Sequence, residues 1–160
     1  MRRARQLLVF DLGGVKVALP VSVVQQVVRV VEVTPLPQAP GFVSGVIDVH
    51  GLVVPVFDLR RRWGLPERAV QLSDQMIIAS TATRTVALLA DAVDGVVEIA
   101  DEKVTAAGEI IPGLASVEGV ARTGEGMVFI HDLDTILSVD EEASLTQAID
   151  AMRSHESRDA

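Results

Sequence analysis

Apolar residues recur along the chain in short runs that are separated by turn residues. Two such runs, residues 7–12 and 15–19, flank Gly13-Gly14, and a two-glycine turn between apolar runs is a strong signal for a β-hairpin. A second hairpin is predicted from residues 46–49 and 52–59, with His50-Gly51 as its turn. Because the runs are short and rich in valine, which packs well on a pleated surface, the pattern indicates strands rather than helices.

Other segments depart from the strand pattern. Three prolines in residues 34–41 remove donors that a strand ladder needs, so this segment is expected to be an extended connector. Just before it, residues 20–25 are expected to form a short helical turn and residues 27–33 a valine-rich strand. Near the end of the chain the apolar spacing becomes helical, and acidic residues open this segment, where the helix dipole favours negative charge. A helix is therefore predicted over residues 140–153, with an apolar stripe that packs back on the β structure: Leu145, Ala148, Ile149 and Met152.

The strand pattern occurs twice. Two blocks of residues match later blocks at nearly constant offsets, sixty-nine residues for the earlier block and seventy-four for the later one. The matches are Val17-Ala18-Leu19 with Val86-Ala87-Leu88, Val24 with Val93, Gly45-Val46 with Gly119-Val120, and Asp58-Leu59 with Asp132-Leu133. We therefore expect one domain over residues 1–160, built from two related β units at residues 7–66 and 75–138. Each unit is too small to form a stable domain alone.

The composition limits which cellular compartment and which kinds of chemical site are expected. Hydrophobic residues make up 49% of the chain and charged residues 22%, as in a folded globular protein, and cysteine is absent. The absence of cysteine excludes disulfides and thiolate metal sites, and it fits a reducing cytoplasm. The apolar stretch after the basic start is too short for a signal peptide, and no apolar run approaches the ~20 residues of a transmembrane helix. We expect a soluble, cytoplasmic protein without direct membrane insertion.

Charge is distributed unevenly along the chain. Residues 1–80 carry nine basic and six acidic side chains, whereas residues 81–160 carry five basic and sixteen acidic ones, which gives the whole chain a net charge of −8. An acidic chain repels phosphate backbones, so no nucleic-acid partner is expected. The acidic residues after Val139 are interpreted as a solvated surface rather than a docking surface.

The catalytic inventory is small. His131 precedes Asp132, but neighbouring strand residues point to opposite faces, so the pair is not expected to form a relay, and His131 is expected on a half-exposed strand. Asp58 and Asp132 each end a strand before a turn, where an aspartate caps backbone amides. No residues occur at the spacings of a zinc, calcium or dinucleotide site. The sequence therefore predicts no enzyme, no cofactor and no metal, and a hydrolase around His131 is kept only as a competing hypothesis.

One basic cluster accompanies the single tryptophan, at Arg60-Arg61-Arg62-Trp63. It could bind a phosphate or an acidic partner. The interpretation that we favour is a short helical turn after a strand, in which Trp63 is buried and the arginines are solvated, because the acidic chain has no other basic stripe.

Residues 42–60 carry a resemblance to a known family. The order of Gly45-Val46, Asp48-Val49-His50-Gly51, an apolar strand with Pro55, and Asp58-Leu59-Arg60 is similar to the central signature of CheW proteins, whose pattern has Asn-x-Arg-Gly at the turn. The resemblance extends colinearly over roughly residues 7–138. It implies an all-β fold of two tandem five-stranded SH3-like barrels that share an apolar core, followed by the C-terminal helix.

The resemblance also implies a function. CheW-like proteins are non-enzymatic adaptors in chemotaxis signalling. One barrel would bind the regulatory domain of a CheA-type histidine kinase, and a groove near the barrel junction would take the cytoplasmic tip of a chemoreceptor. The alternative is a divergent member that binds a different partner in a pilus, gliding or other chemosensory-like system.

Seven residues are carried over as the expected partner-binding set: Val24, Gln26, Val27, Asp48, His50, Gly51 and Arg60. Two of them depart from the family pattern, since His50 replaces an arginine and Gln26 replaces a glutamate. Arginine offers a permanent charge and five donors, whereas a neutral imidazole offers one donor and one acceptor. The two departures together suggest the loss of one polar couple, within the domain or across an interface, and this keeps the alternative open.

Overall fold

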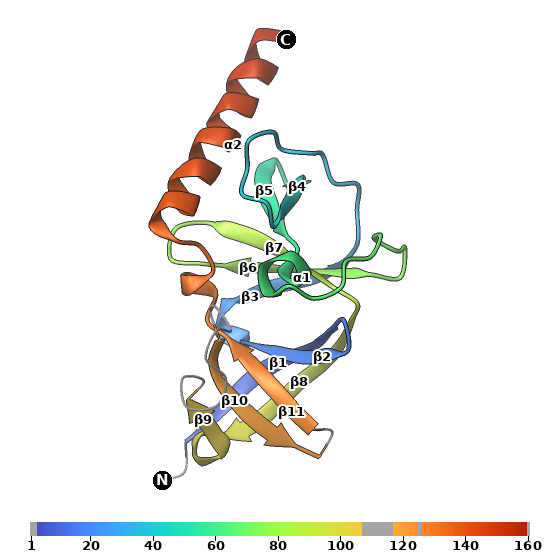
Figure 1. Cartoon of the computed structure of the whole chain (residues 1–160), viewed down its shortest axis with the longest axis vertical. Helices are drawn as coiled ribbons and strands as arrows, with labels where there is room; N and C mark the ends of the chain where they lie inside the picture. The colour runs from blue at the N-terminus through green and yellow to red at the C-terminus, as the bar shows by residue number, and fades with distance from the viewer. Residues whose placement is uncertain (1–2, 107–116, 125, 160) are drawn as a thin grey trace.

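The computed structural model describes residues 3–106, 117–124 and 126–159, and it is dominated by strands with one long helix at the end (Figure 1). The strands are β1 (Ala4–Leu12), β2 (Val15–Pro20), β3 (Val24–Arg29), β4 (Val43–Val49), β5 (Leu52–Phe57), β6 (Gln75–Ser80), β7 (Thr85–Ala90), β8 (Ala92–Ala100), β9 (Val104–Ala106), β10 (Val117–Thr123) and β11 (Gly126–His131). The helical elements are η1 (Val21–Val23), α1 (Leu59–Trp63), η2 (Asp101–Lys103), η4 (Leu133–Thr135) and α2 (Val139–Asp159).

The strands form two sheets, each curled into a barrel, and the barrels stack along the long axis of the molecule (Figure 1). Barrel A has the strand order β8-β1-β2-β11-β10-β9, and barrel B has the order β3-β6-β7-β5-β4. In barrel A, η2 connects β8 directly to β9 at the opposite edge. In barrel B the chain after β3 meets β4 again at a single bridge, Thr34 to Val46. The predicted fold class is confirmed.

Barrel A contains six strands, where the resemblance implied five. The additional strand, β9, pairs with β10 through Thr105 and Val120. The corresponding contact in barrel B is the single Thr34–Val46 bridge, which lies next to Pro35. Because proline cannot donate to a ladder, the connector there cannot extend the bridge into a strand.

The two sheets do not follow the two sequence units. Barrel A takes β1 and β2 from residues 7–66 and β8 to β11 from residues 75–138, and barrel B takes β6 and β7 from the later unit. The exchange is made by two parallel pairs, β11 with β2 and β5 with β7. Each unit therefore donates its first hairpin, β1–β2 or β6–β7, to a sheet whose other strands come from the other unit.

The strand registers repeat with the offsets found in the sequence. Val46 pairs with Pro55 in the β4–β5 ladder, and Val120 pairs with Phe129 in the β10–β11 ladder, seventy-four residues later in both strands. The bulges repeat as well, between Val43 and Gly45 and between Val117 and Gly119. The β1–β2 and β6–β7 ladders match residue for residue at the offset of sixty-nine. The molecule thus has an internal two-fold relationship between barrels A and B.

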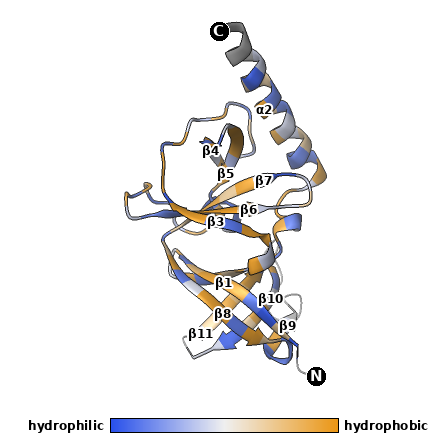
Figure 2. Cartoon of the chain, turned by 180° about the vertical axis from the view of Figure 1, so that it is seen from behind, coloured by the Kyte–Doolittle hydropathy of each residue, from blue (hydrophilic) through white to orange (hydrophobic). Residues whose placement is uncertain are grey.

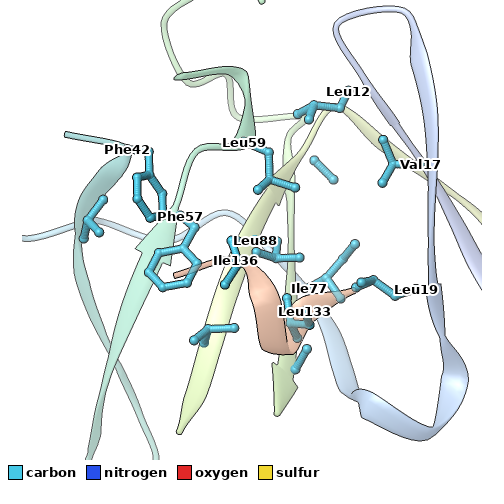
Figure 3. Close-up of a cluster of buried hydrophobic side chains, with 14 of the residues drawn as sticks. Leu12, Val17, Leu19, Phe42, Phe57, Leu59, Ile77, Leu88, Leu133 and Ile136 are labelled. Atoms are coloured by element: carbon cyan, nitrogen blue, oxygen red, sulfur yellow. The ribbon is translucent and has the colours of Figure 1, made fainter. Parts of the chain in front are cut away.

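Apolar side chains form three buried clusters, and period-two alternation decides which cluster each strand residue joins. Leu7 and Val9 fill the interior of barrel A, and their counterparts Met76 and Ile78 fill the interior of barrel B. The intervening residues, such as Leu8 and Phe10, belong to a larger cluster that both barrels share. Figure 3 shows this shared core, and Figure 2 shows the apolar strands that line it. The buried first strand, Leu7 to Phe10, is apolar on both faces because both faces are covered.

Local structure agrees with the turn and cap signals of the sequence. Gly13-Gly14 joins β1 to β2, and both glycines have positive φ. Asp58 caps α1 by accepting from the Arg60 amide, and Asp132 caps η4 by accepting from the Asp134 amide. These capping roles are confirmed.

The C-terminal helix begins and packs as the sequence pattern requires. Ser138 and Glu141 form a reciprocal capping box, in which each side chain accepts from the other residue's amide. Leu145, Ala148 and Ile149 are buried in the shared core, and Met152 packs at its edge. Helix α2 runs from Val139 to Asp159, longer than the predicted 140–153.

Candidate functional site

Three of the candidate residues form the β4–β5 turn at the surface of barrel B. His50 has φ 52° and Gly51 has φ 85°, the two positive values that a type I′ turn requires at its central positions. Asp48 holds the turn, because its Oδ1 accepts from the Gly51 amide at 2.7 Å. The His50 side chain is exposed at the tip. Asp48 and Gly51 therefore position the turn, and His50 presents a side chain from it.

The other candidates of barrel B lie on β3, which is an edge strand that pairs with β6. Val24 and Val27 are half-buried and pack against the shared core. A register shift between Val24 and Gln26 leaves Gln25 outside the ladder, where its amide nitrogen donates to Ser80 and Thr85 on the neighbouring hairpin. The strand thus offers an apolar rim next to the barrel junction.

The structure places Gln26 and His50 on the same barrel but on its two edge strands, β3 and the β4–β5 hairpin. Among the described contacts, none joins the two side chains. This arrangement therefore does not support the hypothesis that these two positions have lost a direct polar contact within the domain. Gln26 is half-buried, and His50 is exposed.

Arg60 lies in the barrel junction, where its side chain is 5% exposed and its guanidinium donates to Asp91. The other carboxylate oxygen of Asp91 accepts from the Gly13 amide at 2.9 Å. Arg68 also donates to Asp91, at 2.6 Å, and binds Asp74 with two hydrogen bonds. The prediction that the arginines of this cluster are solvated is wrong for Arg60, because α1 directs it toward the turn before β8 rather than toward solvent. It is also wrong for Arg62, which is half-buried and donates to Glu141 at 3.0 Å.

The two aspartates of this network, Asp74 and Asp91, are held in their charged forms by the arginines beside them. Burial by itself raises the pKa of Asp91, but hydrogen bonds from Arg60 and from the Gly13 amide outweigh burial, and the net pKa lies below its usual range. Asp74 shows the same balance, with Arg68 as the lowering partner, and its pKa is lowered. The hydrogen bond to Asp74 raises the pKa of Arg68. Arg60, Arg68, Asp74 and Asp91 therefore form a charged brace between α1, the linker and the β7–β8 turn.

His131 is fully buried, not half-exposed as the strand pattern suggested. Its ring lies 5.4 Å from the Trp63 ring, centroid to centroid, and Trp63 is itself only half-buried. Burial lowers the pKa of His131 to about 4. A neutral imidazole with no solvent access offers no general base to a substrate, which argues against the hydrolase hypothesis.

The described residues contain no cluster of three or more histidine, aspartate or glutamate side chains that could hold a metal ion. Within the same residues, no helix is both long and apolar enough to cross a membrane.

Sequence reasoning did not select Val93, although a signal for it existed. Val93 on β8 is the repeat counterpart of Val24 on β3, and both are half-buried against the shared core. Val96, three residues further along β8, is 59% exposed. The internal repeat could therefore have extended the candidate surface from barrel B to barrel A.

Comparisons with known proteins identify the family. A family model described as "CheW-like domain" matches residues 6–141. The chain is 27% identical over 141 residues to "Chemotaxis protein CheW" of Klebsiella aerogenes, covering 87% of this chain and 85% of that protein. It is 25% identical over 142 residues to "Chemotaxis protein CheW" of Treponema pallidum, covering 85% of this chain and 84% of that one.

A solved structure, that of the scaffolding protein TtCheW from Thermoanaerobacter tengcongensis, superposes with a TM-score of 0.80 at 28% identity. The match covers 87% of this chain and 96% of that one. The family model spans the strands of both barrels, and the superposed structure has the same fold over most of the chain. The chain belongs to the CheW-like domain family.

Proposed function

We propose that this chain is a chemotaxis adaptor in which barrel B binds the regulatory domain of a CheA-type histidine kinase. In the same proposal the valine rim at the barrel junction, formed by Val24, Val27 and Val93, binds the cytoplasmic tip of a chemoreceptor. The observation that carries the proposal is the family match over residues 6–141, supported by the structural likeness to a scaffolding protein. The adaptor has no reaction of its own, in keeping with the buried, neutral His131.

The geometry of barrel B supports its part in the proposal. An edge strand presents backbone donors and acceptors that another barrel can pair with or cover. β3 is such an edge, and the β4–β5 turn with His50 marks the other edge strand of the same sheet. A partner that contacts either edge meets side chains held by a rigid ladder, which lowers the ordering cost of binding.

The junction supports the second part. Val24, Val27 and Val93 are half-buried against a core that both barrels share, and Val96 is 59% exposed on β8. Exposed apolar side chains next to a rigid seam are typical of protein docking surfaces. A helical receptor tip that packs there would contact both barrels, so its binding depends on the junction braced by Arg60 and Asp91.

Titration calorimetry with two separate ligands tests the proposal: an isolated CheA-type regulatory domain and a receptor cytoplasmic-tip fragment, both from the same organism as the chain. We expect both to bind. Val27→Asp places an unpaired carboxylate in the rim and should weaken receptor-tip binding at least about tenfold. Val70→Asp, at a linker position that is 52% exposed, is the matched control and should leave both affinities unchanged.

Urea unfolding of each variant separates a loss of binding from a loss of fold. If neither ligand binds the native chain, the proposal is wrong. If the kinase domain binds only after His50→Arg and Gln26→Glu, the alternative of a divergent partner is correct. The comparisons favour the chemotaxis adaptor over that alternative, since both relatives named above are chemotaxis proteins.

A further inference from the structure

The outer faces of the two terminal hairpins are equivalent under the internal two-fold, and each carries a hollow. In barrel B the hollow is about 320 Å³ and is lined by Glu32, Thr34, Val46, Ile47, Asp48, Val53 and Met152. In barrel A the hollow is about 500 Å³ and is lined by Lys103, Thr105, Val120, Arg122 and Met127. The ladder registers relate Val46 to Val120, Asp48 to Arg122 and Val53 to Met127. The bridges to Val46 and Val120 relate Thr34 to Thr105.

Helix α2 covers this face in barrel B. Met152 helps to line the hollow, and Ile149 lines the adjoining groove together with Val53 and Pro55. Arg84 of the β6–β7 hairpin fixes the helix by donating to Glu142 at 2.8 Å and to Thr146 at 2.7 Å. The figures show the helix alongside β5 from both sides of the molecule (Figures 1 and 2). An acidic amphipathic helix is therefore the ligand that this kind of face already accepts.

The face in barrel A differs in two respects. No helix of the described residues lies across it, apart from the three-residue η2 that supplies Lys103, and Met127 is 40% exposed. The charges are also reversed. Glu32 and Asp48 in barrel B correspond to Lys103 and Arg122 in barrel A, which have no carboxylate partner among the described residues. Within the described part of the chain these two cations are therefore unpaired, which is a local departure from the acidic character of a chain with net charge −8.

We infer that the outer face of β10 and β11 is a docking site for an acidic amphipathic helix of a partner protein, in the position that α2 occupies on barrel B. The apolar stripe of the helix packs on Met127, because Val120 is only 4% exposed and forms the floor of the hollow. The carboxylates of the helix lie near Lys103 and Arg122. This surface is distinct from β3, the β4–β5 turn and the valine rim, so the inference goes beyond the proposed function and is tested separately from it.

The chain supplies its own probe and its own reporters. A synthetic peptide of residues 139–159, the sequence of α2, carries six carboxylates, two arginines and the required apolar spacing. Methyl labelling of the methionines in the full chain places Met127 at the proposed site, Met152 at the equivalent hollow of barrel B and Met76 in the interior of barrel B. We expect peptide titration to shift the Met127 methyl resonance saturably below about 1 mM peptide, while Met76 and Met152 stay fixed.

Charge reversal provides the specificity test. Lys103→Glu with Arg122→Glu should weaken peptide binding about tenfold, because two attractions become two repulsions. Arg3→Glu with Arg29→Glu makes the same change in net charge at exposed positions elsewhere and should leave the affinity unchanged. A Met127 resonance that does not move at 1 mM peptide overturns the inference. So does a shift of Met152 instead, which would mean that the peptide exchanges with α2, and so does equal weakening in the two double variants.

Discussion

His131→Phe is predicted to remove a pH dependence of stability that the native chain carries. His131 corresponds to Phe57 in the internal repeat, and both side chains are fully buried at the end of the equivalent strands β11 and β5. The substitution therefore places in barrel A the residue that barrel B already accommodates. What it removes is a titratable group whose pKa is lowered to about 4 by burial.

The difference between the folded and unfolded pKa values of His131 sets the direction and size of the change in the free energy of unfolding with pH. In the unfolded chain His131 titrates near 6.5, so between about pH 6.5 and pH 4 the unfolded state binds a proton that the native state does not. The free energy of unfolding therefore falls as the pH falls through this window. The full loss is roughly 3 kcal/mol, and about 2 kcal/mol of it is reached by pH 5.

Urea unfolding at intervals from pH 7.5 to pH 4.5 measures the effect. We expect the native chain to lose about 2 kcal/mol on going from pH 7.5 to pH 5, and His131→Phe to lose much less. The lowered carboxylate pKa values of Asp74 and Asp91 do not interfere, because their stabilisation is present above about pH 4 and is lost only in stronger acid. Parallel pH profiles for the two proteins would refute the reasoning, since His131 would then be accessible to protons in the native state.

Two further substitutions test the junction and the closure of barrel B. Arg60→Ala should lower the free energy of unfolding by about 2–4 kcal/mol, because Asp91 loses a buried partner and keeps only Arg68 and a backbone amide, whereas Arg61→Ala should change it by less than about 0.5 kcal/mol. If Arg60→Ala has the same free energy of unfolding as the native chain but loses partner binding, Arg60 contacts the partner rather than bracing the junction. Gly45→Ala should cost about 2–4 kcal/mol in the same urea assay, since Gly45 has φ 152° and a Cβ there would lie 2.2 Å from the Thr34 carbonyl oxygen.

Gly124→Ala is the control for the Gly45 substitution. A Cβ at Gly124 meets no atom within 4 Å, so we expect a change within about 0.5 kcal/mol. If the two variants unfold together, the close approach of the connector to β4 is not a feature of the folded chain.

The local features of the fold could be predicted from the sequence because each depends on neighbouring residues. Gly13-Gly14 requires positive φ, Asp58 caps the helix that follows it, and the apolar stripe of α2 has a single helical period. The exchange of hairpins between the sheets could not be predicted in this way. It depends on the parallel pairs of β2 with β11 and β5 with β7, and no turn or periodicity connects strands so far apart in sequence.

The candidate site shows the same division. His50 and Gly51 could be placed at a turn from the sequence alone, and the structure adds the hydrogen bond by which Asp48 of β4 accepts from the Gly51 amide. Arg60 could not be placed, because arginine is rarely buried without a partner and its partner Asp91 lies thirty-one residues away. The burial of His131 was missed for a related reason, since Trp63, which covers it, comes from the other sequence unit.

An adaptor must distinguish its partners, yet a duplicated barrel begins with two equivalent sets of surfaces. Three features remove that equivalence here. Helix α2 covers the outer face of β4 and β5 and leaves the face of β10 and β11 without a helix among the described residues. The hollows on these faces carry opposite charges, with Glu32 and Asp48 on one and Lys103 and Arg122 on the other. The edge strands also differ, since Val96 on β8 is exposed while its counterpart Val27 is half-buried. Because the backbone ladders remain equivalent, the side chains and α2 decide which partner each barrel accepts, and specificity requires no second fold.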